Sequence, residues 1–254
     1  MTNLTPPERF SGHDYPQIIP VPPQRVAGQP APWFVDTARR SGISLETVAE
    51  ALRRRGQHLD NTLIPSDVAE LSGIADGDLT AITRQSAVLV ALFEEDGETH
   101  VVLTRRSMQL RHHRGEVALP GGRSDGEESA IETALREAHE EVGIAPSTVT
   151  PIAWLTPLVT FASGSAIWPV VGILGARPTL VSDPVEVERA FTVSLTELLA
   201  DDAFLEERWR RETSRPGSDP EGFFPISFFR VPGEIIWGAT GRILRELLTI
   251  VSLG

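Results

Sequence analysis

The chain has 254 residues, 41% of them hydrophobic, and a formal net charge of −12. That length can bury one large core or two modest ones, and the acidic balance argues against general binding to nucleic acid, which depends on many lysines and arginines. Because the chain has no cysteine, disulfides and thiolate metal sites are excluded, so that any metal would be held by oxygen or histidine ligands, as suits Mg²⁺ or Mn²⁺.

No stretch of the sequence approaches the run of roughly 18 apolar residues that a membrane-spanning helix needs. The first residues, MTNLTPPERFSGHDYPQ, have neither the basic flank nor the apolar centre of a signal peptide. We therefore expect a cytoplasmic protein with no membrane partner.

The N-terminal part of the chain is predicted to precede the main domain. Eight of the 20 prolines fall within residues 1–34, which predicts an extended or disordered Pro-rich arm. Residues 35–83 are interpreted as an accessory helical segment. Helices are expected at 33–40 and 45–55, with weaker signals for a third near 66–71.

Residues 84–254 are expected to form one enzyme-sized domain. Two β-rich runs, at 86–93 and 100–107, flank the turn signal EDGE and predict a hairpin. The remaining runs predict strands at 151–160, 166–174 and 223–231 and helices near 195–199 and 237–251. Since strands and helices interleave without a regular βαβ rhythm, we predict the α+β class, with a mixed sheet covered by helices.

An acidic helix is predicted from about Glu128 to Val142, ended by Gly143 in a left-handed conformation. Its apolar residues recur at helical spacing and form one narrow stripe toward the core: Ile131, Ala134, Leu135, Ala138 and Val142. At about 100° per residue, three glutamates share an arc of roughly 100° beside that stripe: Glu137, Glu140 and Glu141.

Three carboxylates at one edge of a helix repel one another, which suggests that a cation belongs among them. Oxygen ligands in this arrangement suit one or more divalent cations. Mg²⁺ takes few protein carboxylates and fills its other positions with water and substrate phosphate, so the pattern favours phosphoryl chemistry. For an acidic helix considered by itself, however, an exposed glutamate-rich surface is the commoner meaning.

The spacing of the neighbouring residues decides between these two readings. The fixed positions are Gly122, Glu128, Arg136, Glu137, Ala138, Glu140, Glu141, Gly143 and Ile144. The spacing resembles the complete signature of the Nudix hydrolases, and chance would give it on the order of once in a billion starting positions.

The resemblance implies a Nudix-type α/β/α sandwich that hydrolyses a nucleoside diphosphate linked to another group, with Mg²⁺ or Mn²⁺ as cofactor. By position, the metal-binding groups implied are Glu137, Glu140, Glu141 and the carbonyl of Gly121. Arg136 and Glu128 match the family's supporting pair and complete the catalytic set. Because these two are eight residues apart, they are expected to meet through the loop end or a bridging charge, and to orient rather than react.

The preceding segment, residues 102–122, resembles the second motif of the coenzyme A pyrophosphatase subgroup. The matching positions are Leu103, Thr104, Arg106, Ser107, Arg111, Gly115, Pro120, Gly121 and Gly122. Val102 and Leu119 depart from the motif, since they replace a leucine and a phenylalanine, and the second exchange bears on the shape of a pocket wall. The segment IIWGATGRILRELL is also similar to that subgroup, so the resemblance covers about residues 86–250.

A basic cluster lies in and beside this motif: Arg105, Arg106, Arg111, Arg114 and Arg123. Coenzyme A carries a pyrophosphate and a 3′-phosphate, and the arginine fork binds phosphate oxygens well. We nominate Arg106 and Arg111 as substrate-binding residues. Gly121 and Gly122 join them, because glycine lets the backbone approach a ligand closely.

The expected reaction is therefore hydrolysis of coenzyme A or its thioesters to 3′,5′-ADP and a 4′-phosphopantetheine product. His112, His113 and Glu116 stay open as candidates for the general base. Two alternatives also stay open: a Nudix pyrophosphatase for ADP-ribose, dinucleotides or nucleoside triphosphates, and a non-catalytic Nudix-like binding or regulatory protein. The expected partner is a small nucleotide-derived pyrophosphate and not nucleic acid, and a homodimer is left open.

Overall fold

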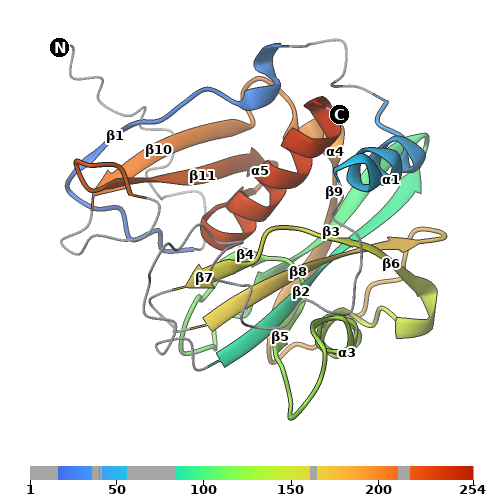
Figure 1. The fold of residues 1–254 in the computed structure, drawn as a ribbon. Coiled ribbons are helices and arrows are strands. Elements are labelled where there is room, and N and C mark those ends of the chain that lie inside the picture. Colours follow the sequence, from blue (N-terminus) through green and yellow to red (C-terminus); the bar gives the residue numbers. More distant parts are fainter. Residues whose placement is uncertain are drawn as a thin grey trace.

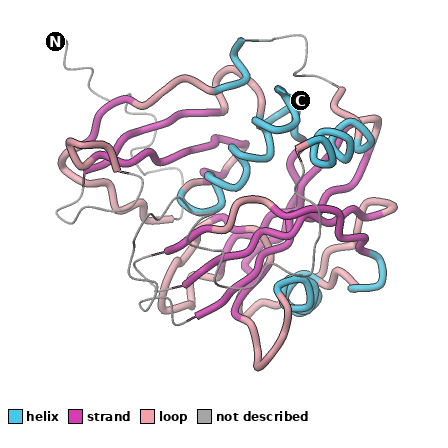
Figure 2. The backbone as a smooth tube through the Cα atoms, viewed as in Figure 1, coloured by secondary structure: helices cyan, strands magenta, loops and turns pink. Residues whose placement is uncertain are grey.

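A computed structural model describes residues 17–35, 40, 42–55, 84–160, 165–210 and 218–253. Within these residues the chain forms an eight-stranded and a four-stranded β-sheet (Figure 1). One helix of 13 residues covers one face of the larger sheet, and the longest described helix, of 16 residues, lies on its opposite face (Figure 2).

The larger sheet is mixed, as the sequence predicted. Its strands are β2 (Arg84–Glu95), β3 (Glu98–Arg106), β4 (Val117–Ala118), β5 (Gly121–Arg123), β6 (Val149–Trp154), β7 (Leu158–Thr160), β8 (Ser165–Leu174) and β9 (Val187–Ser194). Strands β2 and β8 pair in parallel, whereas the other pairs in this sheet are antiparallel. The α+β class is therefore confirmed.

The predicted hairpin is formed by β2 and β3, which pair from Leu92 opposite Val101 to Glu95 opposite Glu98. The two turn residues, Asp96 and Gly97, have φ angles of 53° and 79°. Positive φ at both positions is what a tight two-residue hairpin turn requires, and aspartate followed by glycine adopts it readily.

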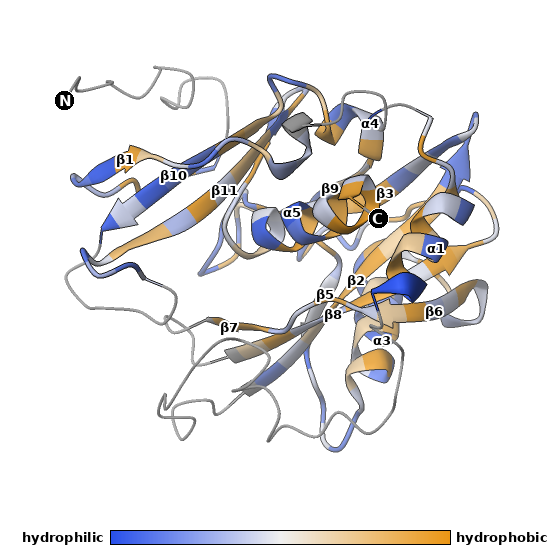
Figure 3. Cartoon of the chain, turned by 45° about the horizontal axis from the view of Figure 1, so that its top comes forward, coloured by the Kyte–Doolittle hydropathy of each residue, from blue (hydrophilic) through white to orange (hydrophobic). Residues whose placement is uncertain are grey.

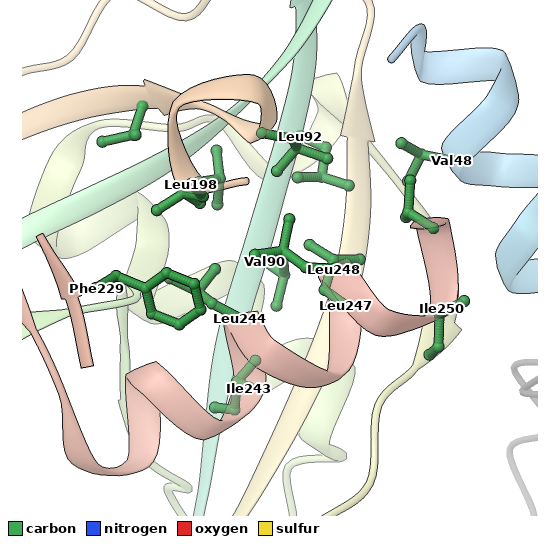
Figure 4. Close-up of a cluster of buried hydrophobic side chains, with 14 of the residues drawn as sticks. Val48, Val90, Leu92, Leu198, Phe229, Ile243, Leu244, Leu247, Leu248 and Ile250 are labelled. Atoms are coloured by element: carbon green, nitrogen blue, oxygen red, sulfur yellow. The ribbon is translucent and has the colours of Figure 1, made fainter. Parts of the chain in front are cut away.

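Strand β2 is buried on both faces, and its side chains point alternately into two separate cores. Val90 and Leu92 point toward helix α5 (Gly238–Leu253), as Figure 4 shows. Leu89 and Phe93 pack on the other face in a separate cluster that includes Ala138 of helix α3 (Ala130–Val142). Helices thus cover both faces of a strand whose side chains alternate between two cores.

The other described helices are short. They are the 3-10 turns η2 (Pro32–Val35) and η6 (Pro146–Thr148) and the α-helices α1 (Leu45–Arg54) and α4 (Leu195–Leu198). The helix expected at 45–55 is confirmed as α1, which is capped by Ser44. The one expected at 33–40 is described only as the turn η2, and the segment near 66–71 lies outside the described residues. In the described parts of the chain, no helix is long and apolar enough to cross a membrane.

The four-stranded sheet was not predicted. It has the order β1 (Arg25–Ala27), β10 (Phe204–Arg210), β11 (Phe223–Val231), β12 (Glu234–Ile236), and only β11 was expected from the sequence. In Figure 3, β10 is coloured largely hydrophilic beside the hydrophobic β11. Yet Glu206 and Glu207 of β10 are buried. Arg245 lies 2.9 Å from Glu206, and the indole N–H of Trp209 donates to Glu207 over 2.7 Å.

Helix α5 lies between the two sheets and joins them through one core (Figures 1 and 4). That core unites Leu244 and Leu248 of α5 with Phe229 of β11 and Val90 of β2. The helix approaches β11 closely at Gly241, where a Cβ atom would lie 2.4 Å from the carbonyl oxygen of Ser227. Glycine at this position therefore sets the distance between the helix and the smaller sheet.

We predict that Gly241→Ala lowers the free energy of unfolding by about 1–3 kcal/mol, because the added methyl group forces α5 away from β11. Urea denaturation of the purified protein measures this change. Gly175→Ala is the matched control, since a Cβ atom there meets no atom within 4 Å. Equal stability of the two variants would show that α5 shifts without cost.

Candidate active site

The acidic helix α3 spans Ala130–Val142 and begins two residues later than expected. Ser129 caps it in a reciprocal capping box with Glu132, and Gly143 ends it with a φ angle of 75°, as predicted. In the expected apolar stripe, Ala134, Ala138 and Val142 are buried, whereas Ile131 and Leu135 are only partly buried. Because the cap is Ser129, Glu128 lies in the loop before the helix.

That loop position lets Glu128 meet Arg136 directly. The Nε and Nη2 groups of Arg136 donate to the two oxygens of Glu128 over 2.7 and 3.0 Å. The Nη1 group donates to Glu137 over 3.0 Å and to Glu140 over 2.9 Å. The hydrogen bonds from Arg136 hold the pKa of Glu128 at about 2. The pair therefore meets through the loop end, without a bridging charge.

Glu141 is the most buried of the three predicted glutamates, with 3% of its surface exposed. One carboxylate oxygen accepts the N–H of Gly121 over 3.0 Å, and the other lies 3.6 Å from Arg106. The pKa of Glu141 is raised to about 7, mainly by burial; the N–H of Gly121 and the charge of Arg106 oppose this rise, and the charges of Glu137 and Glu186 add to it. A bound cation would stabilise the charged form.

The other two glutamates have different surroundings. Glu137 is mostly buried, and burial is the main cause that raises its pKa. Its carboxylate packs over the backbone of β5, where a Cβ atom at Gly122 would lie 2.5 Å from Glu137 Cδ. Glu140 is 58% exposed and is paired with Arg136. Of the three glutamates in the predicted arc, Glu137 and Glu141 are therefore largely buried and Glu140 is exposed.

Glu186 is a fourth carboxylate at this site and was missed in the sequence. It lies just before β9, close enough that its charge raises the pKa of both Glu137 and Glu141. The pairing of β9 with β3 brings it there, since Val187 stands opposite Arg106. No motif or periodicity singled out Glu186, because its place depends on a strand pairing between distant segments.

The donor set fits a hard divalent cation, because buried carboxylates with raised pKa values lack enough positive charge in their surroundings. Among the described residues, no three acidic or histidine side chains converge on one point as they stand. Glu137 and Glu140 turn toward Arg136, and Glu141 turns toward the N–H of Gly121. The contact described for Gly121 is thus through its N–H group, whereas the resemblance implied its carbonyl.

The basic cluster expected from the sequence is divided by the alternation of β3. Arg105 pairs with Glu234 over 2.9 Å and with Glu188 over 3.2 Å, on the side away from Glu141. Arg106 faces Glu141 instead. Arg111 is exposed in the following loop and has no ion pair within the described residues. Of the two nominated arginines, Arg111 is therefore the one not already engaged.

Two of the three candidates for the general base are paired with each other. The Nδ1 atom of His113 lies 2.9 Å from the carboxylate of Glu116, and this hydrogen bond raises the pKa of His113. His112 is exposed beside them. The loop is closed at its base, where Arg106 and Glu116 join through a backbone hydrogen bond of 2.9 Å.

Comparisons with known proteins match this part of the chain. The family model described as NUDIX domain matches residues 83–213. An uncharacterized Nudix hydrolase, NudL, of Photorhabdus laumondii subsp. laumondii is 38% identical over 171 residues, which cover 67% of this chain and 86% of the relative. NudL of Yersinia enterocolitica is 35% identical, covering 70% and 86%. Nudix hydrolase 3 of Caenorhabditis elegans is 32% identical, covering 65% and 72%.

The raised pKa of Glu141 predicts how pH changes the stability of the metal-free protein. In the folded state the pKa of this carboxyl is about 7, against an ordinary value of 4.5, so its burial lowers the free energy of unfolding as pH rises between these values. We expect Glu141→Gln to match the wild type near the lower pH and to be more stable at pH 8 by roughly 1–3 kcal/mol.

Urea denaturation in excess chelator at both pH values measures this difference. A Glu141→Gln protein that is equally destabilised at both pH values would instead assign the carboxylate a structural role. Glu132→Gln, on the same helix but in its exposed capping box, should show no such dependence on pH.

Proposed function

The chain belongs to the Nudix hydrolase family, whose reaction is the hydrolysis of a pyrophosphate bond in nucleoside diphosphate derivatives, and we propose that its substrate is coenzyme A or an acyl-coenzyme A. The products would be 3′,5′-ADP and 4′-phosphopantetheine or its acyl form. The observation that carries this proposal is Arg111, which is exposed, forms no ion pair with another described residue, and lies on a loop that begins at Arg106, 3.6 Å from Glu141.

The residues of the second motif support the proposal through the contacts that hold this loop. The hydroxyl of Thr104 donates to the carbonyl of Ala118 over 3.2 Å. The N–H of Gly115 donates to the carbonyl of Arg106 over 3.1 Å, and Gly115 has a φ angle of 66° that favours glycine. These contacts close the loop at its base, so that Arg111 projects from a fixed frame.

In this proposal, Arg106 and Arg111 bind phosphate oxygens, and the backbone at Gly121 and Gly122 lets the pyrophosphate lie close to the carboxylates. Glu137, Glu140 and Glu141 would hold Mg²⁺ or Mn²⁺. When bound, the cation polarises the pyrophosphate and lowers the pKa of the attacking water.

The supporting pair, Arg136 and Glu128, contacts other side chains of the site. Arg136 is fixed by its two hydrogen bonds to Glu128 and in turn holds the carboxylates of Glu137 and Glu140. Two parallel hydrogen bonds from a guanidinium to a carboxylate restrict rotation of both side chains. We therefore infer that Arg136 and Glu128 orient the ligands and take no part in the proton transfers.

One observation favours the second candidate, a Nudix pyrophosphatase for ADP-ribose, dinucleotides or nucleoside triphosphates. Arg105 is paired with Glu234 and Glu188, and Arg106 already lies near Glu141. With fewer free arginines than the sequence suggested, the site has less positive charge to offer a 3′-phosphate. Comparing the products from a panel of these pyrophosphates distinguishes the two candidates.

The metal requirement gives a direct test. Activity should be lost in excess chelator and should return with Mg²⁺ or Mn²⁺. Glu141→Gln should lower kcat by roughly three powers of ten, because loss of a charged ligand removes several kcal/mol of transition-state stabilisation. Glu132→Gln should keep wild-type kcat. Full turnover of the wild type in excess chelator would contradict the mechanism.

The substrate is tested by Arg111→Ala. If Arg111 contacts the 3′-phosphate, this change should raise KM for coenzyme A about tenfold more than KM for dephospho-coenzyme A, with kcat nearly constant. High salt should weaken the preference of the wild type. Arg177→Ala serves as control, since Arg177 is an exposed arginine paired with Glu95 in another part of the domain. Faster cleavage of dinucleotides than of coenzyme A at equal low concentration would overturn the assignment.

A further inference from the structure

The N-terminal segment is attached to the domain through the side chain of Gln17. This residue is buried, with 6% of its surface exposed. Its Nε2 group donates to the carbonyl of Ile235 over 2.5 Å, and its Oε1 atom accepts the indole N–H of Trp237 over 3.1 Å. The segment that precedes β1 therefore reaches the start of α5 (Figure 1). Both polar atoms of the Gln17 amide are thus hydrogen-bonded.

The chemistry of the two partners fixes the orientation of this amide. A carbonyl oxygen only accepts hydrogen bonds and an indole N–H only donates them, so a flipped amide would lose both bonds. The partners are themselves held firmly. Ile235 is 1% exposed in β12, and its neighbour Glu234 pairs with Arg105 at the end of β3. The side chain of Gln17 therefore holds the main chain of the segment in a fixed place.

The main chain of Gln17 lies against the loop of Arg111, residues 106–116. A Cβ atom at Gly115, near the end of that loop, would lie 3.4 Å from both N and Cα of Gln17 and 2.9 Å from Sδ of Met108. Gly115 is buried there, and its N–H donates to the carbonyl of Arg106 over 3.1 Å. The end of the loop is therefore held from two sides, by the start of the loop and by the N-terminal segment.

This support bears on substrate binding because several residues of the loop project into solvent. Arg111, His112 and Arg114 are exposed. When Arg111 binds a phosphate, the loop must become ordered unless the fold already orders it, and each group that is ordered on binding weakens affinity. A contact at Gly115 restricts the loop before the substrate arrives.

We propose that Gln17 is a positioning residue for substrate binding, whose buried amide holds the N-terminal segment against Gly115 and so keeps Arg111 in place. The inference rests on the proposed function, in which Arg111 binds a phosphate of coenzyme A. It gives the N-terminal segment a part in the site, where the sequence predicted only an extended arm. Because the amide acts through its hydrogen bonds, methionine, which has a similar length and no amide, should not replace it.

The first measurement is amide hydrogen exchange of the full chain without substrate. Gln17→Met removes both hydrogen bonds and should make the loop of Arg111 exchange faster, while exchange in the hairpin of β2 and β3 stays unchanged. Gln24→Met is the matched control. It makes the same replacement in the same segment, but the side chain of Gln24 accepts from Arg210 over 3.4 Å, at the end of β10. This control should exchange like the wild type in the loop.

The second measurement is kinetic. If Arg111 keeps its binding position only about a fifth of the time in Gln17→Met, KM for coenzyme A rises about fivefold while kcat stays nearly constant. KM for dephospho-coenzyme A should rise less. In an Arg111→Ala background, Gln17→Met should not change KM further, because both changes affect the same contact. General destabilisation would instead lower the amount of active protein, and hence the apparent kcat, without this change in KM.

Three results would overturn the inference: unchanged exchange in the loop, equal effects of Gln17→Met and Gln24→Met, or an effect of Gln17→Met on KM that persists in the Arg111→Ala background. If Arg111→Ala raises KM and Gln17→Met does not, the inference fails and the proposed function stands. If Arg111→Ala itself leaves KM unchanged, the proposed role of Arg111 is wrong and the inference fails with it.

Discussion

The close approach of helix α3 to strand β5 is the constraint on which the site depends. A Cβ atom at Gly121 would lie 2.3 Å from the carbonyl oxygen of Ala87, and one at Gly122 would lie 2.5 Å from Glu137 Cδ. Because Gly121 has no side chain, β5 lies close to β2, and because Gly122 has none, Glu137 of α3 packs over β5. The N–H of Gly121 then reaches Glu141. The two glycines therefore allow carboxylates of α3 to be buried against the backbone of β5.

The concentration of negative charge on α3 follows from this packing. A surface helix would place its glutamates in water, where repulsion between neighbours costs little. Here Glu141 is buried and Glu137 mostly so, while Arg136 neutralises only the outer side of the cluster. The buried side is left with Arg106 at 3.6 Å from Glu141 and one backbone N–H, which is little positive charge for two buried carboxylates. This imbalance supports our proposal that the site binds a small cation of high charge.

Features encoded within short stretches could be predicted from the sequence, and features that depend on distant pairing could not. The α3 helix, its Gly143 cap and the β2–β3 hairpin follow from local spacing and turn chemistry. Glu186 could not be found, because only the pairing of β9 with β3 brings it to α3. Strand β10 was missed for another reason: two of its glutamates are buried against partners that hydropathy does not reveal.

The pairing of Arg105 with the smaller sheet shows how the two sheets act together at the site. Arg105 and Arg106 are adjacent in sequence, but strand alternation sends them to opposite faces of β3. Arg105 bonds to Glu234 of β12, which is 1% exposed, and so fixes the smaller sheet to the end of β3. Arg106 is left on the face of Glu141. Of these two adjacent arginines, Arg105 therefore stabilises the fold and Arg106 contributes positive charge to the site. For this reason, the number of basic residues in the sequence overstates the positive charge that is offered to a substrate.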